Sequence, residues 1–262
     1  MNTQNMTPEE IAHIAPSVMQ MTAKPELSER YIHVPTSTLI EDMNALGWNV
    51  VDVKQVKCRN EEKRPYVKHL VTFRNPSLLI KSKNGDDVCP QILIVNSHDG
   101  LSSFQFRAGI FRLICSNGLV VCTQDFGSIN MRHKGYSFEK VKEITMDLVN
   151  RMPYVIDTLN KFTQVSLTEE QKIEFALQSI GIRFEDGKSL VKPEDILKPK
   201  RQEDMGNDLW SVLNTIQERL IQGDFNQVNP HTHKVRKARS IKNFKKDIEL
   251  NEKLFNLAYQ YI

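Results

Sequence analysis

The sequence has no segment that would anchor it in a membrane or carry it out of the cell. Among its 262 residues no apolar run approaches the roughly 20 residues that a helix needs to cross a bilayer. Residues 1–23 also lack the charged start and the continuous apolar core of a secretory signal peptide. We therefore expect a soluble protein in the cytoplasm of a bacterial host.

Cysteine is scarce, and its spacing argues against the usual zinc sites. The four cysteines are Cys58, Cys89, Cys115 and Cys122, and no two of them form a C-x-x-C pair. Three lie among apolar, strand-like residues, which favours buried, reduced thiols over disulfides. The pair His231-x-His233 could bind a metal, but its basic surroundings would repel a cation. The sequence therefore predicts no metal site and no cofactor.

The motifs of common nucleotide-binding and hydrolytic enzymes are also missing. The chain contains no G-x-x-x-x-G-K-[ST] loop and no G-x-G-x-x-G loop to cradle phosphates. It also lacks the G-x-S-x-G turn that presents a nucleophilic serine. We accordingly predict a protein that is not an enzyme.

What the chain does contain is an ordinary globular composition whose periodicity changes midway. Hydrophobic residues make up 40% and charged residues 26%. One amphipathic helix comes first, and alternating strands with turn signals at Asn84-Gly85 and Asn117-Gly118 follow it. After Ser137 the apolar period becomes helical. This order predicts an α+β fold: an antiparallel β-meander preceded by a helix and followed by a helical C-terminal half.

Local signals predict where several elements begin, end or break. The helix starts are predicted from the capping boxes Thr38-x-x-Glu41 and Thr168-x-x-Gln171 and from caps at Ser137 and Asn207. Gly47, Gly181 and Gly223 are expected just past helix ends, Gly109 is expected to interrupt a strand, and Pro153 is expected to kink or break a helix.

These elements suggest three regions. Residues 1–30 are predicted to be an N-terminal arm, and residues 31–185 an α+β core domain with the antiparallel sheet. Residues 186–262 are predicted to be a helical C-terminal region, in which residues 224–240 form a polar, basic loop.

Positive charge is concentrated in two segments of a chain whose net charge is only +3. Lys54 to Arg74 holds seven basic and two acidic residues, and His231 to Lys246 holds seven basic residues and no acid. Such segments are typical of contact with a polyanion, although solvated surface loops are an alternative explanation. Cations near the start of the last helix oppose the helix dipole unless an anion binds there. The candidate contacts are Lys54, Lys57, Arg59, Lys63, Arg64, Tyr66, Lys68, Arg74, Lys234, Arg236, Lys237, Arg239, Lys242, Lys245 and Lys246.

Two short motifs suggest catalysis, and each has a simpler explanation. Asp52-Val53-Lys54 places an acid and a lysine on one side of a strand, as in magnesium-dependent nucleases, with Glu41 or Asp42 as a further acid. A polar strand face explains the same pattern. His98-Asp99-Gly100 resembles an acid–base pair, but Asp-Gly between two strands is first of all a hairpin turn.

The central segment resembles a phage/plasmid-like family of unknown function, the domain of unknown function 932. The resemblance rests on residues 96–100, on the Phe104-x-Phe106-Arg107 run through Phe111-Arg112-Leu113, and on residues 115–120. Residues 207–218 and the basic stretch after them are similar to the C-terminal part of that family. The resemblance covers residues 30–262 and implies a mobile-element protein with no established activity. Because Arg107 and Arg112 lie amid apolar strands, we add them to the candidate contacts.

These observations predict a non-enzymatic protein that binds nucleic acid, single-stranded DNA first, in replication, recombination or strand annealing. The order of helix, meander and helices is also similar, in topology only, to single-strand annealing proteins of the Red-beta and Erf type. The prediction requires the two basic segments to converge into one cationic track. An inhibitor of a host defence complex and a magnesium-dependent nuclease remain alternatives. A host or phage protein partner and a homo-oligomer also stay open.

Overall fold

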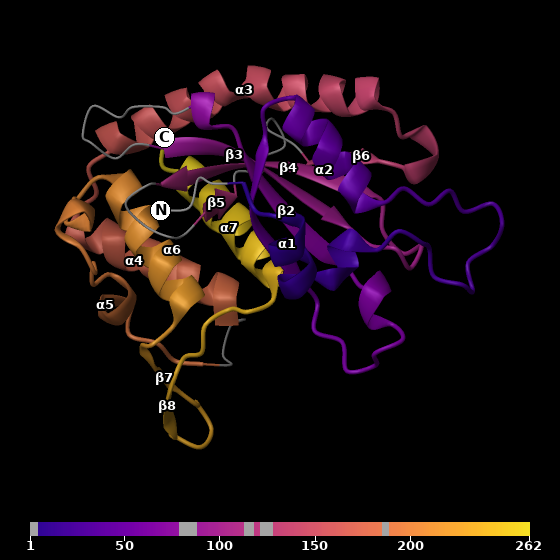
Figure 1. Ribbon diagram of the computed structural model, residues 1–262. Coiled ribbons are helices and arrows are strands. Elements are labelled where there is room, and N and C mark those ends of the chain that lie inside the picture. Colours follow the sequence, from indigo (N-terminus) through magenta and orange to yellow (C-terminus); the bar gives the residue numbers. More distant parts are fainter. Residues whose placement is uncertain (1–4, 79–87, 113–117, 121–127, 185–188) are drawn as a thin grey trace. The chain divides into compact units, whose positions relative to one another are not determined.

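The computed structural model describes residues 5–78, 88–112, 118–120, 128–184 and 189–262 (Figure 1). The chain divides into two compact units, Met1–Met152 and Pro153–Ile262. We call them the N-terminal unit and the C-terminal unit and describe each by itself. Together their elements make the α+β fold that the sequence predicts.

The N-terminal unit is built on an antiparallel meander. The strands β1 to β5 follow one another in the sheet, and β6 pairs with β4 beside β5. The strands are β1 (Asn49–Gln55), β2 (His69–Arg74), β3 (Val88–Asn96), β4 (Phe104–Arg112), β5 (Gly118–Val120) and β6 (Ser128–Met131). The helices are α1 (Pro8–Ile14), α2 (Thr36–Ala45) and α3 (Phe138–Gln164), of which only the part up to Met152 belongs to this unit, and the short 3-10 turns are η1 (Pro16–Met19), η2 (Arg64–Tyr66), η3 (Pro76–Leu78) and η4 (His133–Gly135).

The core of this unit joins one face of the sheet to α1, α2 and the first half of α3. Phe104 and Phe106 alternate on β4 with more polar residues, so both rings point to the same face and are fully buried. Burial of such a ring stabilises the fold by roughly 2–3 kcal/mol before conformational entropy is counted. The arm predicted at residues 1–30 includes α1 and η1, which contribute Ile11 and Val18 to this core.

Two local predictions in this unit are wrong. Helix α2 begins at Thr36, directly after Pro35, so Thr38 lies inside the helix and caps nothing. Pro35 has a φ of −59°, which suits a helix entry without a side-chain cap. Gly109 does not interrupt β4, because a Cβ at this position would lie 2.7 Å from Leu93 and 2.8 Å from Gln91 of the neighbouring strand. The glycine permits the close pairing of the two strands.

Of the kink or break predicted at Pro153, the break does not occur, because helix α3 runs from Phe138 to Gln164 with Pro153 inside it. Ser137 accepts a hydrogen bond from the Lys140 amide, which confirms it as the cap. Proline removes one backbone donor and crowds the preceding turn. A stripe of buried side chains with helical spacing continues on both sides and favours the helix: Leu148, Met152, Val155, Leu159 and Phe162.

The C-terminal unit consists of helices and one small hairpin. Its elements are α4 (Glu169–Phe184), α5 (Pro193–Ile196), the 3-10 turn η5 (Gln202–Asp204), α6 (Leu209–Gln222), β7 (Asn226–Val228), β8 (Val235–Lys237) and α7 (Phe244–Tyr259). The helices α4, α6 and α7 pack against one another, and their apolar side chains make the core of the unit. None of the described helices combines the length and the hydropathy that crossing a membrane requires.

The helix ends in this unit confirm some local signals and correct others. Thr168 and Gln171 form the predicted reciprocal capping box, and Gly223 ends α6. Helix α4 continues past Gly181 to Phe184. Asp208, not Asn207, caps α6 by accepting a hydrogen bond from the Ser211 amide at 3.0 Å.

The segment 224–240 is not a simple loop, because it contains the antiparallel hairpin β7–β8. The backbone of Val228 also forms a bridge with Leu190. The unit boundary after Met152 differs from the boundary after residue 185 that the sequence suggested. The predicted turns at Asn84-Gly85 and Asn117-Gly118 include positions outside the described residues.

Candidate nucleic-acid interface

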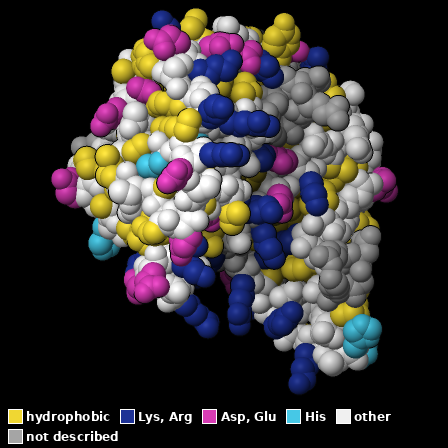
Figure 2. Space-filling model, turned by 90° about the vertical axis from the view of Figure 1, so that its right-hand side faces the viewer, with side chains coloured by type: hydrophobic (Ala, Val, Ile, Leu, Met, Phe, Trp, Pro, Cys, Tyr) yellow, Lys and Arg dark blue, Asp and Glu magenta, His cyan; other side chains and the backbone are white. Residues whose placement is uncertain are grey.

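The hairpin β7–β8 displays most of the second basic segment. Lys234, Arg236 and Lys237 are exposed on its second strand and at its tip, together with the side chains of His231 and His233. In Figure 1 the hairpin extends below the helices of its own unit. Figure 2 shows Lys, Arg and His side chains gathered on this hairpin, and Asp224 is the carboxylate that pairs with one of them, Lys237. The hairpin therefore presents positive charge to solvent.

The tip of the hairpin is ordered by one side chain. The Oδ1 atom of Asn229 accepts hydrogen bonds from the amides of His231 at 2.9 Å and Thr232 at 2.8 Å. The backbone amides of Asn229 and His233 close the turn, and His233 adopts a φ of +53°. Cations on an ordered loop lose less conformational entropy on binding than cations on a flexible one.

The backbone after the hairpin passes very close to the end of α6. Gly223 has a φ of +76°, and a Cβ there would lie 2.5 Å from the carbonyl oxygen of Ala238. The amides of Asp224 and Ala238 pair with the opposite strand at this point. The glycine thus fixes where the basic segment leaves the hairpin.

The basic segment then leads into α7. Asn243 caps this helix, accepting hydrogen bonds from the amides of Lys245 and Lys246, which occupy its first turn. Two cations at a helix start are unfavourable next to the positive end of the helix dipole. An anion bound nearby would remove this penalty.

Acidic residues neutralise little of the second segment. Lys237 pairs with Asp224 and Lys245 with Glu249, both at 3.7 Å and on exposed side chains. Exposed pairs of this kind contribute about 0–1 kcal/mol and exchange readily with other partners. No other cation of this segment has an ion pair within the described residues: Lys234, Arg236, Arg239, Lys242 and Lys246.

The first basic segment surrounds the connection between β1 and β2. Lys57, Arg59 and Lys63 are exposed there and have no ion pair among the residues that the structure describes. The Oδ1 atom of Asn60 accepts hydrogen bonds from the Glu62 and Lys63 amides and orders the loop. This loop and the hairpin tip are therefore both shaped by an asparagine.

The other candidates of the first segment are either paired at the surface, where the ion pairs exchange readily, or partly buried. Lys54 pairs with Asp52 at 3.5 Å, and Arg64 pairs with Glu61 at 3.2 Å. Tyr66 and Lys68 are half-buried. Arg74 is only 9% exposed, and burial lowers the pKa of its guanidinium. Arg74 therefore lies apart from the exposed cations of its segment.

Arg107 and Arg112 both belong to β4. Arg107 is half-buried opposite Leu93 on β3 and Ser128 on β6. The side chain of Arg112 lies outside the described residues. The two basic segments lie in different units, so their convergence into one track stays a prediction.

The nuclease motif has a local explanation. Asp52 and Lys54 share one side of β1, as predicted, and contact each other. Asp42 accepts a short hydrogen bond from the Tyr136 hydroxyl, and burial together with this carboxylate raises the pKa of that hydroxyl. Among the described residues, no three His, Cys, Asp or Glu side chains are arranged to hold a metal ion.

His98 belongs to a buried polar cluster that the sequence analysis missed. Residues 97–103 turn the chain between the antiparallel strands β3 and β4, and Gly100 has a φ of +75°. The side chain of His98, however, is fully buried. Its ring lies 4.7 Å from the ring of His33 and 5.1 Å from that of His69.

One chain of hydrogen bonds runs through this cluster. The Nδ1 atom of His69 donates to the carbonyl of Val67, so its Nε2 atom accepts from the Thr36 hydroxyl at 2.8 Å. Asn96 donates from Nδ2 to Thr36 at 3.0 Å and accepts at Oδ1 from His133 at 2.9 Å. Both histidine tautomers are fixed by carbonyl oxygens that can only accept. The bonds of His69 and His133 are made with neutral rings, whereas Nδ1 of His98 and both ring nitrogens of His33 are buried without a hydrogen-bond partner among the described residues.

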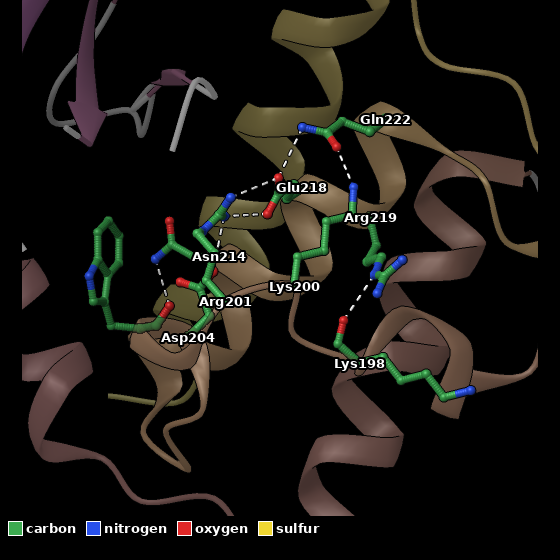
Figure 3. Close-up of polar contacts among 9 residues, drawn as sticks. Lys198, Lys200, Arg201, Asp204, Asn214, Glu218, Arg219 and Gln222 are labelled. Carbon is green, nitrogen blue, oxygen red and sulfur yellow. Dashed lines mark hydrogen bonds and ion pairs between the residues drawn. The ribbon is translucent and has the colours of Figure 1, made fainter. Parts of the chain in front are cut away.

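The C-terminal motif that resembled the family also has structural roles. Asn214 donates to the carbonyl of Trp210 at 2.7 Å, within α6. Arg201 makes an ion pair with the buried carboxylate of Glu218 and another with Asp204. Figure 3 shows the contacts of Arg201, together with the bond between Gln222 and Glu218, as one network beside α6, and the bond of Asn214 as a separate contact. The motif therefore stabilises the unit that carries the hairpin.

Comparison with known proteins now assigns the family. The family model described as Domain of unknown function (DUF932) matches residues 26–255. The chain belongs to this family. The UPF0380 protein YfjQ of Escherichia coli (strain K12) is 30% identical over 256 residues, covering 97% of this chain and 90% of the relative.

A second relative supports the same assignment. The UPF0380 protein YafZ of Escherichia coli (strain K12) is also 30% identical, over 253 residues, again covering 97% of this chain and 90% of the relative. No solved structure matches this member of the DUF932 family. Neither printed name states an activity, so any function must be argued from the residues of this chain.

Proposed function

We propose that this protein binds nucleic acid without catalysing a reaction on it, and that single-stranded DNA is its preferred polymer. Its role would be in replication, recombination or strand annealing of a phage or plasmid. One observation carries the proposal: the cations of the second basic segment stand on an ordered hairpin and its exit, mostly without carboxylate partners.

The fold leaves most cations of the second basic segment without a carboxylate partner among the described residues. Exposed lysines and arginines that release counterions from phosphates supply most of the affinity of non-specific DNA binding. Arg236 and Lys237 are neighbours on β8, so their side chains point to opposite faces of the strand, and Lys234 directly precedes it. All three are exposed, so phosphates of a single strand that passes the hairpin can be contacted from either face.

A labelled single-stranded oligonucleotide tests the proposal. Fluorescence anisotropy at low salt should show saturable binding that weakens steeply as salt is added. A duplex of the same sequence provides the comparison for polymer preference, and weaker binding to it is expected. Absence of binding to the single strand at low salt would overturn the proposal.

The same oligonucleotide tests the absence of catalysis. After incubation with magnesium it should be recovered intact on a denaturing gel. Cleavage that Asp52→Ala abolishes would instead establish the nuclease alternative and would contradict the non-enzymatic part of the proposal.

A further inference from the structure

A cavity of about 450 Å³ lies within the C-terminal unit, beside the basic segment. It is formed by the end of α4, the residues that precede α7, and the first half of α7. Small-ligand sites usually have roughly 300–1,000 Å³, so this cavity has room for a whole nucleotide and not only for an inorganic ion. Its cationic lining residues are Arg183, Arg239, Lys242, Lys246 and Lys253.

Negative charge is sparse among the described residues that line this cavity. Glu249 is the carboxylate among its lining residues, and it lies 3.7 Å from Lys245. No lining cation has an ion pair within the described residues. Apolar surface comes from Ile182, Ile241 and Leu250. The cavity thus combines excess positive charge with apolar contacts, which suits a ligand with a phosphate and a less polar body.

Arg183 is the cation that the fold holds most firmly. Its guanidinium carbon lies 4.8 Å from the ring centre of Phe184 and 5.4 Å from that of Phe225. Its Nη2 atom donates to the carbonyl of Arg239 at 2.5 Å. Two rings and one carbonyl therefore hold the guanidinium in place before any ligand arrives.

One nitrogen of this guanidinium lacks a hydrogen-bond partner among the described residues. Its Nη1 atom is shielded from solvent and makes no hydrogen bond within the part of the chain that the structure describes. Burial lowers the pKa of Arg183 to about 10, which still leaves it charged at neutral pH. A partly buried charge without an anionic partner is costly, and a bound anion would remove that cost.

We propose that this cavity binds the terminal phosphate of a nucleotide, as found at the 5′ end of a nucleic-acid strand. When the ligand is a strand, this inference rests on the proposed function. A free 5′-mononucleotide carries the same terminal phosphate monoester and is the other source of this ligand. A phosphate monoester carries a charge of about −1.5 to −2 at pH 7 and offers three acceptor oxygens. Internal phosphates of a strand carry only one negative charge, so the cavity favours the end of the strand.

Two oligonucleotides that differ only at the 5′ end test this inference. Both carry a 3′ fluorophore and the same sequence, and one has a 5′-phosphate whereas the other has a 5′-hydroxyl. The phosphorylated strand should bind about tenfold more tightly, as expected for one additional charged contact. If both bind with affinities within about twofold, the terminal-phosphate site is wrong although the proposed function survives.

Two variants test whether Arg183 causes the preference for the strand with the 5′-phosphate. Arg183→Gln should reduce the difference between the two strands to within about twofold. Arg236→Gln on the hairpin is the matched control: it should weaken both strands by the same factor and keep their ratio. Loss of the ratio in Arg236→Gln but not in Arg183→Gln would overturn the assignment. Should Arg183→Gln fail to fold by circular dichroism, the double variant of the exposed Lys242→Gln and Lys253→Gln takes its place.

A free nucleotide separates this site from binding of the strand. Thymidine 5′-monophosphate should raise the melting temperature of the protein, whereas thymidine at the same concentration should not. This shift should disappear in Arg183→Gln. If neither oligonucleotide binds but the monophosphate shift is present, the proposed function fails and the phosphate site stands for a free nucleotide. If neither the shift nor a difference between the strands appears, the site is refuted.

Discussion

His69 and His98 have no solvent-exposed surface, and this burial changes their chemistry. Desolvation lowers the pKa of His69 to about 4 and that of His98 to about 3. The positive charge that either would gain faces the other rings of the cluster, which adds to the shift for His98. At the scale of single residues, the N-terminal unit is therefore built for neutral histidines.

This burial predicts that stability falls as the pH is lowered. In the unfolded chain both histidines take up protons near their ordinary pKa of 6.5, whereas in the folded chain they remain neutral down to about pH 4. Because the unfolded state binds more protons in this window, the free energy of unfolding should decrease as the pH falls through 6.5, and the slope should approach its limit of about 1.4 kcal/mol per pH unit for each histidine below about pH 6. Urea denaturation at several values between pH 7 and pH 4.5 measures this slope.

Substitutions identify the source of this pH dependence. His69→Gln should flatten the slope by about 1.4 kcal/mol per pH unit, because one buried histidine is gone. His231→Gln at the exposed hairpin tip should leave it unchanged. Equal slopes for His69→Gln and the unchanged protein would contradict the assignment to the cluster.

At the scale of secondary-structure elements, helix α6 carries Glu218, which pairs with Arg201, and ends at Gly223 directly before the basic hairpin. Its start is set by Asp208, which accepts hydrogen bonds from the Ser211 amide at 3.0 Å and the Ser211 hydroxyl at 2.6 Å. Asn207, one residue earlier, instead accepts a hydrogen bond from Lys172. Neighbouring residues of similar chemistry thus have different roles.

A pair of alanine variants distinguishes these roles. Asp208→Ala should lower the free energy of unfolding by about 1 kcal/mol, because the helix loses its N-terminal cap. Asn207→Ala removes only an exposed contact and should cost a few tenths of a kcal/mol. Chemical denaturation measures both. A larger loss for Asn207→Ala would show that the helix begins differently in solution.

At the scale of the whole molecule, the open matter is whether both basic segments contact one strand. For single-stranded nucleic acid, each phosphate contact contributes about 0.7 to the slope of log K against log salt. Replacing Lys57, Arg59 and Lys63 by glutamine should therefore lower the magnitude of this slope by about 2. Replacing Lys234, Arg236 and Lys237 in the same way should have a similar effect.

The control for this salt titration removes the same charge elsewhere. Lys140, Lys142 and Lys161 are exposed on α3 and belong to neither segment. Their replacement by glutamine should leave the slope unchanged. An equal decrease in this control would mean that net charge alone drives binding, and an effect of only one of the two segments would refute the shared track.

Local patterns predicted the class of fold and several element ends. The side chains of Thr168 and Gln171 each accept a hydrogen bond from the backbone amide of the other, three residues away, so the sequence contains the whole interaction. The capping box at Thr38 was wrong because the helix already begins at Thr36, directly after Pro35, so that Thr38 lies inside it. The strands were recognisable from alternation, whereas Gly109 was misjudged because its function depends on Leu93 and Gln91 of another strand.

The candidate site likewise has a part that local patterns reveal, the hairpin cations, and a part that they do not, the cavity around Arg183. The exposed cations on and around the hairpin follow one another along the chain, so counting charges found them. Arg183 and Lys253 were missed, although Lys246 and Lys253 are spaced by two helical turns and could have suggested a shared face. The contact between Arg183 and Arg239 spans 56 residues, and no local pattern indicates it.

By itself the sequence determined the class of fold, most of the strands and helices, and where positive charge concentrates along the chain. These properties depend on periodicity, on caps and on residues a few positions apart. Only the tertiary structure decided that His69 pairs with Asn96 across β2 and β3, and that Arg183 meets the basic segment at a cavity. The physical reason is that strand register and helix packing bring together residues distant in sequence, and their mutual burial then determines charge, tautomer and access to ligand.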